Sequence, residues 1–102
     1  MILINGVRWK IFRVSPSNPY LSTPEGKVAL GCCDRVEHTI YINNKLKGKK
    51  LKQVLCHEIT HAVLYSNNVL MLPKEEEIVA EIFRKYGFKI IELTQKAYRK
   101  IK

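Results

Sequence analysis

The segment Leu51–Ser66, LKQVLCHEITHAVLYS, decides how the rest of the chain is interpreted. Its apolar residues recur at spacings of three and four, as they do along one face of an α-helix. Further apolar residues occupy the other faces, so we expect a buried central helix that ends near Ser66, where two asparagines follow. The residues that share the principal apolar face are Leu51, Leu55, Ile59 and Ala62.

Two histidines of this segment, His57 and His61, are spaced so that a helix places them on one side, about one turn apart. They can therefore offer two imidazole nitrogens to a single metal ion. Glu58 lies roughly 100° further round the helix, close to such an ion without being needed as a ligand. This HExxH pattern is typical of zinc sites in which the glutamate acts as a general base, and it should arise by chance in well under ~1% of chains this short. The alternative is a surface helix that happens to carry two histidines, but buried histidines and a buried carboxylate are costly to desolvate without a partner.

A zinc site that keeps one position open needs a third protein ligand. Pro73 starts the next predicted helix, and its first turns carry Glu75, Glu76, Glu77 and Glu81. Glu77 and Glu81 share a face at i, i+4, so one could bind the ion while the other orients a ligating histidine. A solvated acidic N-terminus that favours the helix dipole is the alternative, and it alone would explain Glu75 and Glu76.

Together, the HEITH motif, fifteen intervening residues and the segment EIVAEIF (residues 77–83) resemble the metallopeptidases of the ImmA/IrrE type. The second motif of that family reads E-x-x-A-[N/D]-x-F. Short members from phages and prophages also share the strand, loop and hairpin before the helix and the ending around residues 86–93. The resemblance therefore spans most of the chain.

This resemblance implies a zincin-like fold and a zinc-dependent metallopeptidase that hydrolyses a peptide bond in a protein substrate, encoded by a phage or another mobile element. It assigns the metal ligands to His57, His61 and Glu77 and the general base to Glu58. The position of a supporting acid falls on Glu81, where the family usually has asparagine or aspartate. Larger relatives carry an additional helix-turn-helix or partner domain, so the resemblance does not identify the substrate.

The remaining segments predict one α+β domain over residues 1–102. Residues 7–14 alternate apolar and basic side chains as a half-buried strand does, and residues 15–26 form a loop rich in proline. Residues 28–33 and 39–43 suit a hairpin. We expect a small, mostly antiparallel sheet of three or four strands packed on the HExxH helix, followed by two further helices separated near Gly87. By analogy with other zincins, residues 39–43 are a candidate docking strand for a substrate.

The net charge of +9, from eighteen basic and nine acidic residues, favours acidic partners or nucleic acid. The basic residues are spread over 45–52 and 84–102 without interleaved aromatics, so a nucleic-acid-binding protein is the less favoured alternative. A catalytically silent metal-binding module that acts by protein contact is another. Neither a signal peptide nor an apolar run of ~18 residues is present, so we expect a cytoplasmic protein with no membrane partner.

Four further residues receive weaker predictions. His38 lies in a predicted turn, where an exposed histidine without a metal role is expected. Tyr41 and Tyr65 could donate a hydrogen bond to an oxyanion, although packing is favoured for both. Cys56 is expected to be a small core residue, and the three cysteines lack the spacing of a disulfide framework or a zinc knuckle.

Overall fold

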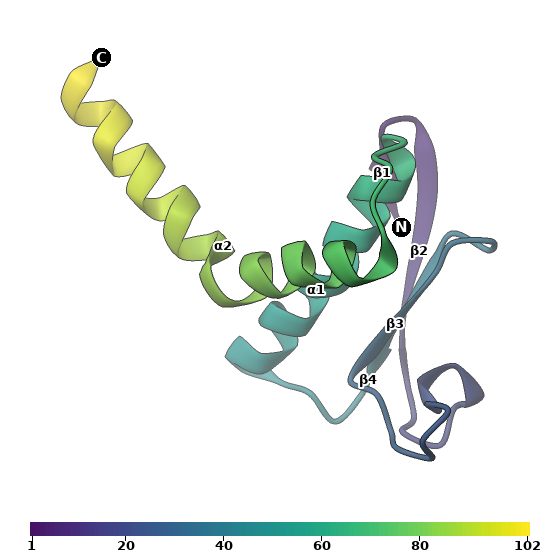
Figure 1. Ribbon diagram of the computed structural model, residues 1–102. Helices are drawn as coiled ribbons and strands as arrows, with labels where there is room; N and C mark the ends of the chain where they lie inside the picture. Colours follow the sequence, from purple (N-terminus) through teal and green to yellow (C-terminus); the bar gives the residue numbers. More distant parts are fainter.

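A computed structural model describes all residues, 1–102, and shows an α+β architecture in which four strands precede two helices (Figure 1). The predicted α+β class is therefore confirmed. Neither helix is long and apolar enough to cross a membrane. The strands are β1 (Ile2–Ile4), β2 (Val7–Val14), β3 (Gly31–Asp34) and β4 (Thr39–Asn43), and the helices are α1 (Gly48–Ser66) and α2 (Pro73–Ile101).

The four strands form one mixed sheet in the order β1-β2-β4-β3. The outer pairs, β1 with β2 and β3 with β4, are antiparallel, whereas β2 and β4 are parallel. The prediction of a mostly antiparallel sheet is therefore wrong. The physical reason is the strand order: the long loop after β2, which contains a short 3-10 helix (Pro19–Leu21), carries the chain to the edge of the sheet, where β3 forms. Strand β4 then fills the place between β3 and β2, and because it runs in the same direction as β2 the two are parallel.

Strand β4 lies inside the sheet, with β2 on one side and β3 on the other. Both of its edges are occupied by ladder hydrogen bonds, so the expectation that residues 39–43 form a docking strand is wrong. The two edge strands are β1 and β3, and β3 is the one that packs more closely beside α1.

The hydrophobic core lies between the sheet and α1 and is built on Trp9, Ile40, Ile42, Val54 and Ala62. Trp9 is completely buried, and its indole nitrogen donates a 2.8 Å hydrogen bond to the hydroxyl of Ser66, which fixes the end of α1 to β2. Helix α1 is less enclosed than predicted, because its first turn is exposed and Val63 and Tyr65 face solvent near its end.

Helix α2 is continuous from residue 73 to residue 101, so the expectation of two helices separated near Gly87 is wrong. Gly87 is buried against α1, where a Cβ atom would lie 3.2 Å from the Phe83 side chain and 3.8 Å from the Cys56 sulfur. Glycine therefore serves close helix packing here and does not end the helix.

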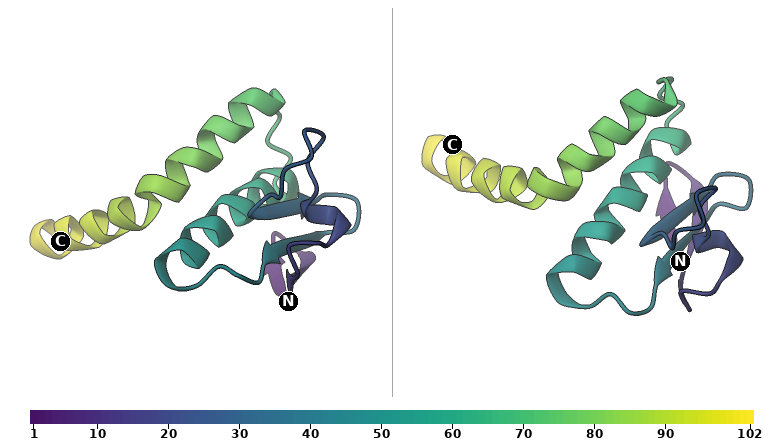
Figure 2. Two further views of the ribbon diagram at one scale, coloured as in Figure 1. Left: turned by 90° about the horizontal axis from the view of Figure 1, so that it is seen from below. Right: turned by 60° about the horizontal axis from the view of Figure 1, so that its bottom comes forward.

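Beyond Gly87 the helix leaves the rest of the molecule, as two further views show (Figure 2). Every residue from 88 to 102 is exposed, and we call this segment the C-terminal arm. The radius of gyration is 14.9 Å, compared with about 13 Å for a compact chain of this length. The first half of α2, residues 73–87, is the part that packs on α1 and positions the site.

Candidate metal centre

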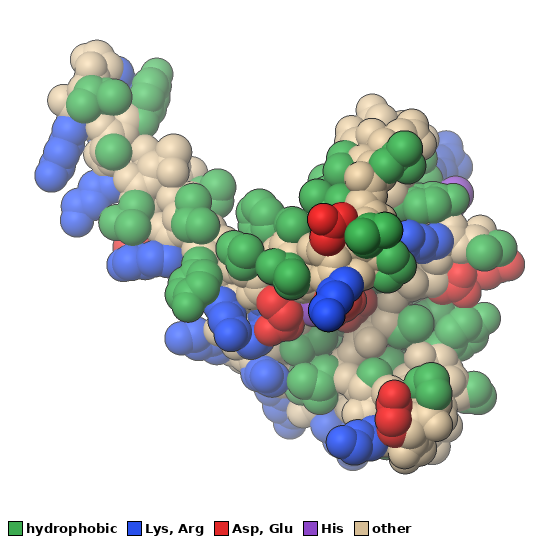
Figure 3. Space-filling view, viewed as in Figure 1, with side chains coloured by type: hydrophobic (Ala, Val, Ile, Leu, Met, Phe, Trp, Pro, Cys, Tyr) green, Lys and Arg blue, Asp and Glu red, His purple; other side chains and the backbone are tan.

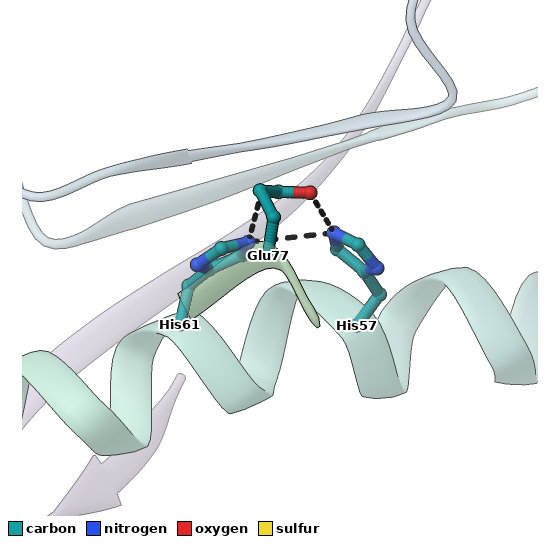
Figure 4. A group of neighbouring side chains, drawn as sticks. All are labelled: His57, His61 and Glu77. Atoms are coloured by element: carbon teal, nitrogen blue, oxygen red, sulfur yellow. Dashed lines mark hydrogen bonds and ion pairs between the residues drawn. The ribbon is translucent and has the colours of Figure 1, made fainter. Parts of the chain in front are cut away.

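Helix α1 presents His57 and His61 one turn apart, and the first turns of α2 bring Glu77 to the same place (Figure 4). The Nε2 atoms of the two histidines are 3.3 Å apart. The Glu77 carboxylate lies between them, with Oε1 2.7 Å from Nε2 of His61 and Oε2 3.4 Å from Nε2 of His57. The structure thus brings together the three residues that the sequence singled out as metal ligands, and their donor atoms lie within 4.8 Å of one another.

The chemistry and spacing of this donor set suit zinc. Zinc binds histidine nitrogen and carboxylate oxygen at ~2.0–2.2 Å in a tetrahedron, which requires ligand atoms about 3.3 Å apart. The two Nε2 atoms, 3.3 Å apart, have this separation, and the Glu77 carboxylate approaches them with different oxygens, at 3.4 Å from His57 and at a hydrogen-bond distance of 2.7 Å from His61. Two histidines and one carboxylate could therefore hold a divalent ion and leave a fourth position open.

Each histidine is also held from its other ring nitrogen by a separate carboxylate. Oε1 of Glu81 lies 3.0 Å from Nδ1 of His57, and Oε1 of Glu76 lies 2.6 Å from Nδ1 of His61. Contacts of this kind fix the ring orientation and direct the lone pair of Nε2 toward a metal. Glu81 thus lies where an acid that orients a ligating histidine is expected.

Glu76 differs most from expectation, because it is buried and not solvated. The helix places Glu76 on the same side as Ala80, and this side of α2 faces α1. Arg35, in the turn between β3 and β4, donates a hydrogen bond to the same Oε1 atom that contacts His61. The i, i+4 relation between Glu76 and Ala80 could have indicated this burial, but no periodic signal marks Arg35.

Arg84 holds Glu81, the acid that contacts His57. Its guanidinium donates hydrogen bonds of 3.0 Å and 2.9 Å to the two oxygens of Glu81. These hydrogen bonds are the main reason that the pKa of Glu81 lies below its ordinary value. Glu81 is therefore kept ionised and directed at His57.

Glu58 lies between α1 and β3, with 7% of its surface exposed. The backbone of Gly31 leaves the room for it, because a Cβ atom at that position would lie 2.9 Å from Cγ of Glu58. Burial raises the pKa of Glu58 to about 7, while nearby His61 lowers it and Glu77 raises it. A carboxylate with a pKa near neutrality is suited to accept and return a proton.

Two cavities meet beside Glu58 and form one groove, because Gly31, His57 and Glu58 line both. The larger cavity, of about 560 Å³, extends toward Arg35 and also contains His61 and Glu77. The smaller cavity, of about 370 Å³, extends toward the start of α1, where Lys50 and Val54 line it together with Arg84 of α2. The candidate metal ligands and Glu58 therefore lie at the centre of a groove that could admit an extended chain.

The two tyrosines considered as hydrogen-bond donors to an oxyanion pack against other aromatic rings. Tyr41 stacks on Tyr20 with ring centroids 4.1 Å apart, and Tyr65 meets Trp9 edge to face. Neither Tyr41 nor Tyr65 lines the groove, whereas Tyr20 does. Tyr20 lies in the proline-rich loop, where the sequence offers no periodic pattern to indicate it.

His38 and Cys56 both lie outside the groove. His38 lies 5.1 Å from the Trp9 ring between centroids and is partly buried, so it is less exposed than expected, and it lies outside the metal-ligand group. The thiol of Cys56 donates to the carbonyl of Phe83 at 3.6 Å, within the contact between the two helices.

No protein-family model, curated protein or solved structure matches this chain. The class of protein is therefore inferred from the motif and from the geometry of the site.

Proposed function

We propose that this protein is a zincin-like zinc metallopeptidase of the ImmA/IrrE type that hydrolyses a peptide bond in a protein substrate. One observation carries the proposal: Nε2 of His57, Nε2 of His61 and the carboxylate of Glu77 converge beside a buried acid, Glu58, whose pKa is raised to about 7. Two histidines and a glutamate with an adjacent general base are the donor set of hydrolytic zinc sites.

In this proposal His57, His61 and Glu77 hold the ion, which when bound would supply Lewis-acid activation of water and of the scissile carbonyl. Glu58 removes the proton of the attacking water and returns it to the leaving amine. Its burial supports this role, because an acid with a pKa near the working pH can both accept and donate. Glu76 and Glu81 keep the two imidazole rings in their ligating orientation.

The substrate is proposed to add as a strand to β3 (Gly31–Asp34). This strand has a free edge, borders the groove, and begins at Gly31 directly beside Glu58. In other zincins a substrate strand pairs with the sheet edge next to the metal-binding helix, and the assignment to β3 is made by that analogy. Tyr20, which lines the same groove, is a candidate to donate a hydrogen bond to the oxyanion.

The first experiment asks whether the metal is present and where it binds. Purified protein should contain about one equivalent of zinc, and the His57→Ala, His61→Ala double variant should contain almost none. Glu77→Gln should bind zinc more weakly by at least ~10–100-fold, since the loss of even an outer-shell partner has that effect. Equal zinc content in the wild type and the double variant would show that no such site exists.

The second experiment tests the chemistry. Zinc-loaded wild type and Glu58→Gln are incubated with a peptide library derived from a bacterial proteome, and new termini are identified by mass spectrometry. We expect cleavage by the wild type and a rate lower by ~10²-fold or more in Glu58→Gln, with zinc content unchanged. Equal zinc binding with no cleavage by either protein would indicate a metal-binding module without catalysis.

A further inference from the structure

The groove continues beyond the candidate metal centre toward the start of the C-terminal arm. The cavity that Lys50 and Arg84 line is next to another of about 300 Å³, which lies between the first turns of α1 and the middle of α2 and has Arg84 as a shared wall. We call these two neighbouring cavities the basic cleft. Its cationic side chains are Lys49, Lys50, Lys52, Arg84, Lys85 and Lys89.

Positive charge in the basic cleft is poorly balanced within the chain. Lys49, Lys50, Lys52 and Lys85 form no ion pair, whereas Lys89 meets Glu92 at 3.5 Å and Arg84 is paired with Glu81. Figure 3 shows Lys and Arg side chains along one edge of the molecule, from the arm across the beginning of α1. These cations repel one another, and an anionic partner would relieve that repulsion.

The first turn of α1 adds to this imbalance. It contains no acidic residue, although the N-terminus of a helix carries a partial positive charge that acidic side chains normally offset. Lys49 and Lys50 occupy this turn, where lysine is electrostatically unfavourable. The positive potential of the cleft therefore has two sources, the lysine side chains and the helix end.

We propose that the basic cleft binds an acidic segment of the substrate, so that the substrate class is a protein with several Asp or Glu residues on one side of the scissile bond. That the bound segment belongs to a substrate rests on the proposed peptidase function. Binding of an acidic peptide in the basic cleft does not depend on that function. Lysine ammonium groups act as separate point charges that suit individual carboxylates along an extended peptide. Because the cleft continues the groove at His57 and Glu58, a bound acidic segment leads the chain to those residues.

The cleft suits an acidic peptide better than a nucleic acid. Proteins that bind single strands offer free aromatic faces on which bases stack. Phe88 is the aromatic residue that lines the cleft, and Nζ of Lys52 already lies 4.8 Å from the centre of its ring. The cleft therefore offers a single aromatic ring with a lysine already over one face, whereas stacking of successive bases needs several rings. The ring provides an apolar wall for the stems of acidic side chains.

The binding test uses zinc-loaded, full-length Glu58→Gln, which should hold a peptide without cleaving it. The probe is a fluorescein-labelled peptide of about ten residues, long enough in extended form to cross both cavities, with glutamates in one half. The matched probe has glutamine at the same positions. Fluorescence anisotropy should show at least about tenfold tighter binding of the glutamate peptide at low salt, and the difference should shrink as salt screens the charges.

Two charge-reversal variants locate the binding site. Lys50→Glu with Lys85→Glu changes the cleft, and Lys96→Glu with Lys100→Glu makes the same change in net charge on the exposed arm. We expect the cleft variant to weaken binding of the glutamate peptide by about tenfold or more and the arm variant by less than about threefold, since distant exposed charges are screened. Lys50→Gln with Lys85→Gln, which removes charge without reversal, should weaken binding to an intermediate degree.

Several outcomes would overturn the proposal. Equal affinity for the two peptides would do so, and so would equal losses of affinity in the cleft and arm variants. Tighter binding of a single-stranded oligonucleotide of equal charge, if the cleft variant also loses it, would assign the cleft to nucleic acid. Failure of the peptidase proposal is distinguishable: selective glutamate-peptide binding without any cleavage by the wild type leaves the cleft assignment intact. Cleavage without preference for acidic peptides removes the cleft assignment alone.

Discussion

At the scale of single residues, one oxygen atom connects three elements of the fold. Oε1 of Glu76 accepts from Arg35 in the β3–β4 turn and lies 2.6 Å from Nδ1 of His61 on α1, while Glu76 itself belongs to α2. A buried carboxylate with two charge-assisted partners is strongly held, and the orientation of His61 is fixed with it. Arg35 therefore acts on the candidate metal centre through Glu76.

Glu76→Gln should weaken zinc binding by ~10–100-fold, because an amide cannot give His61 the same charged support. Arg35→Met should have a smaller effect in the same direction, since Glu76 stays in place but loses one partner. Zinc affinity is measured by competition with a chromophoric chelator. Glu75→Gln is the control, because Glu75 is exposed and contacts the backbone of Leu72 and not a histidine. Wild-type affinity in Glu76→Gln would refute the role of this carboxylate.

Glu58 should make the metal-free protein less stable as the pH rises. Its pKa in the folded state, about 7, is above the ordinary value of 4.5, so the folded state binds more protons than the unfolded state between these values. The contribution of Glu58 to the free energy of unfolding is then greatest below about pH 4.5. It falls as the pH rises through about 7, by at most roughly 3 kcal/mol.

Urea denaturation with chelator present checks this at pH 5 and pH 8. Wild type should lose more stability between the two pH values than Glu58→Gln, which has no proton to release at that position. The same pH dependence in both proteins would show that Glu58 does not titrate in this range.

At the scale of elements, helix α1 was predictable and the strand order was not. The three- and four-residue spacing of apolar residues indicated α1, and Ser66 is its last residue in the structure. The i, i+4 spacing also placed His57 beside His61, because that geometry depends only on the helix. The parallel pairing of β2 with β4 depends on the path of the loop between β2 and β3, and local sequence does not determine that path.

Helix α2 shows a second feature that local sequence does not determine, the role of a glycine within a helix. Gly87 resembles a helix end in the sequence, but its role depends on how closely α1 approaches, which only the tertiary structure defines. The burial of Glu76 depends on tertiary structure in the same way, because an acid in the first turn of a helix is usually solvated. The residues missed at the site are those whose partners lie on other elements.

The close approach of β3 to α1 is required for Glu58 to fit, and it can be tested with Gly31→Ala. The added Cβ would lie 2.9 Å from Cγ of Glu58 and 3.0 Å from Oε2, so the glutamate or the strand must move. We expect a loss of stability of about 1–3 kcal/mol, typical of overpacking. Zinc binding should change little, because the clash does not involve the proposed ligands.

A double-mutant cycle attributes this loss to the contact. In a Glu58→Ala background the side chain that the new methyl group meets is absent, so Gly31→Ala should be much less destabilising than in the wild type. Urea denaturation of the four proteins gives the coupling energy. Equal losses in the two backgrounds would show that Gly31 matters for another reason.

At the scale of the whole molecule, the proposed zinc joins α1 to α2, whereas the core joins α1 to the sheet. Trp9, Ile40 and Ile42 pack under α1 without using either histidine that is proposed to bind zinc. Removal of zinc should therefore loosen α2 and leave the sheet and α1 in place. This predicts a partial effect of chelation on stability.

Chelation should lower the melting temperature without abolishing the fold. A ligand present at 100 times its Kd contributes about 2.7 kcal/mol, which for a chain of this size is a shift of about 10 °C or more. Thermal melts followed by far-ultraviolet circular dichroism, with and without chelator, measure it. Complete unfolding on chelation at 25 °C would show that the metal is structural.

The C-terminal arm has a consequence for the dynamics of the chain. Its residues 88–102 are all exposed, so their amide protons are protected mainly by the hydrogen bonds of the helix itself. Isolated helices shorter than ~12–15 residues are marginal in water, and helix–coil relaxation takes ~0.1–1 μs. In hydrogen exchange, the amides of the arm should exchange through local fraying, while those around Ile40 and Ile42 require global opening. The last turns of α2 therefore melt and re-form many times before the core opens once.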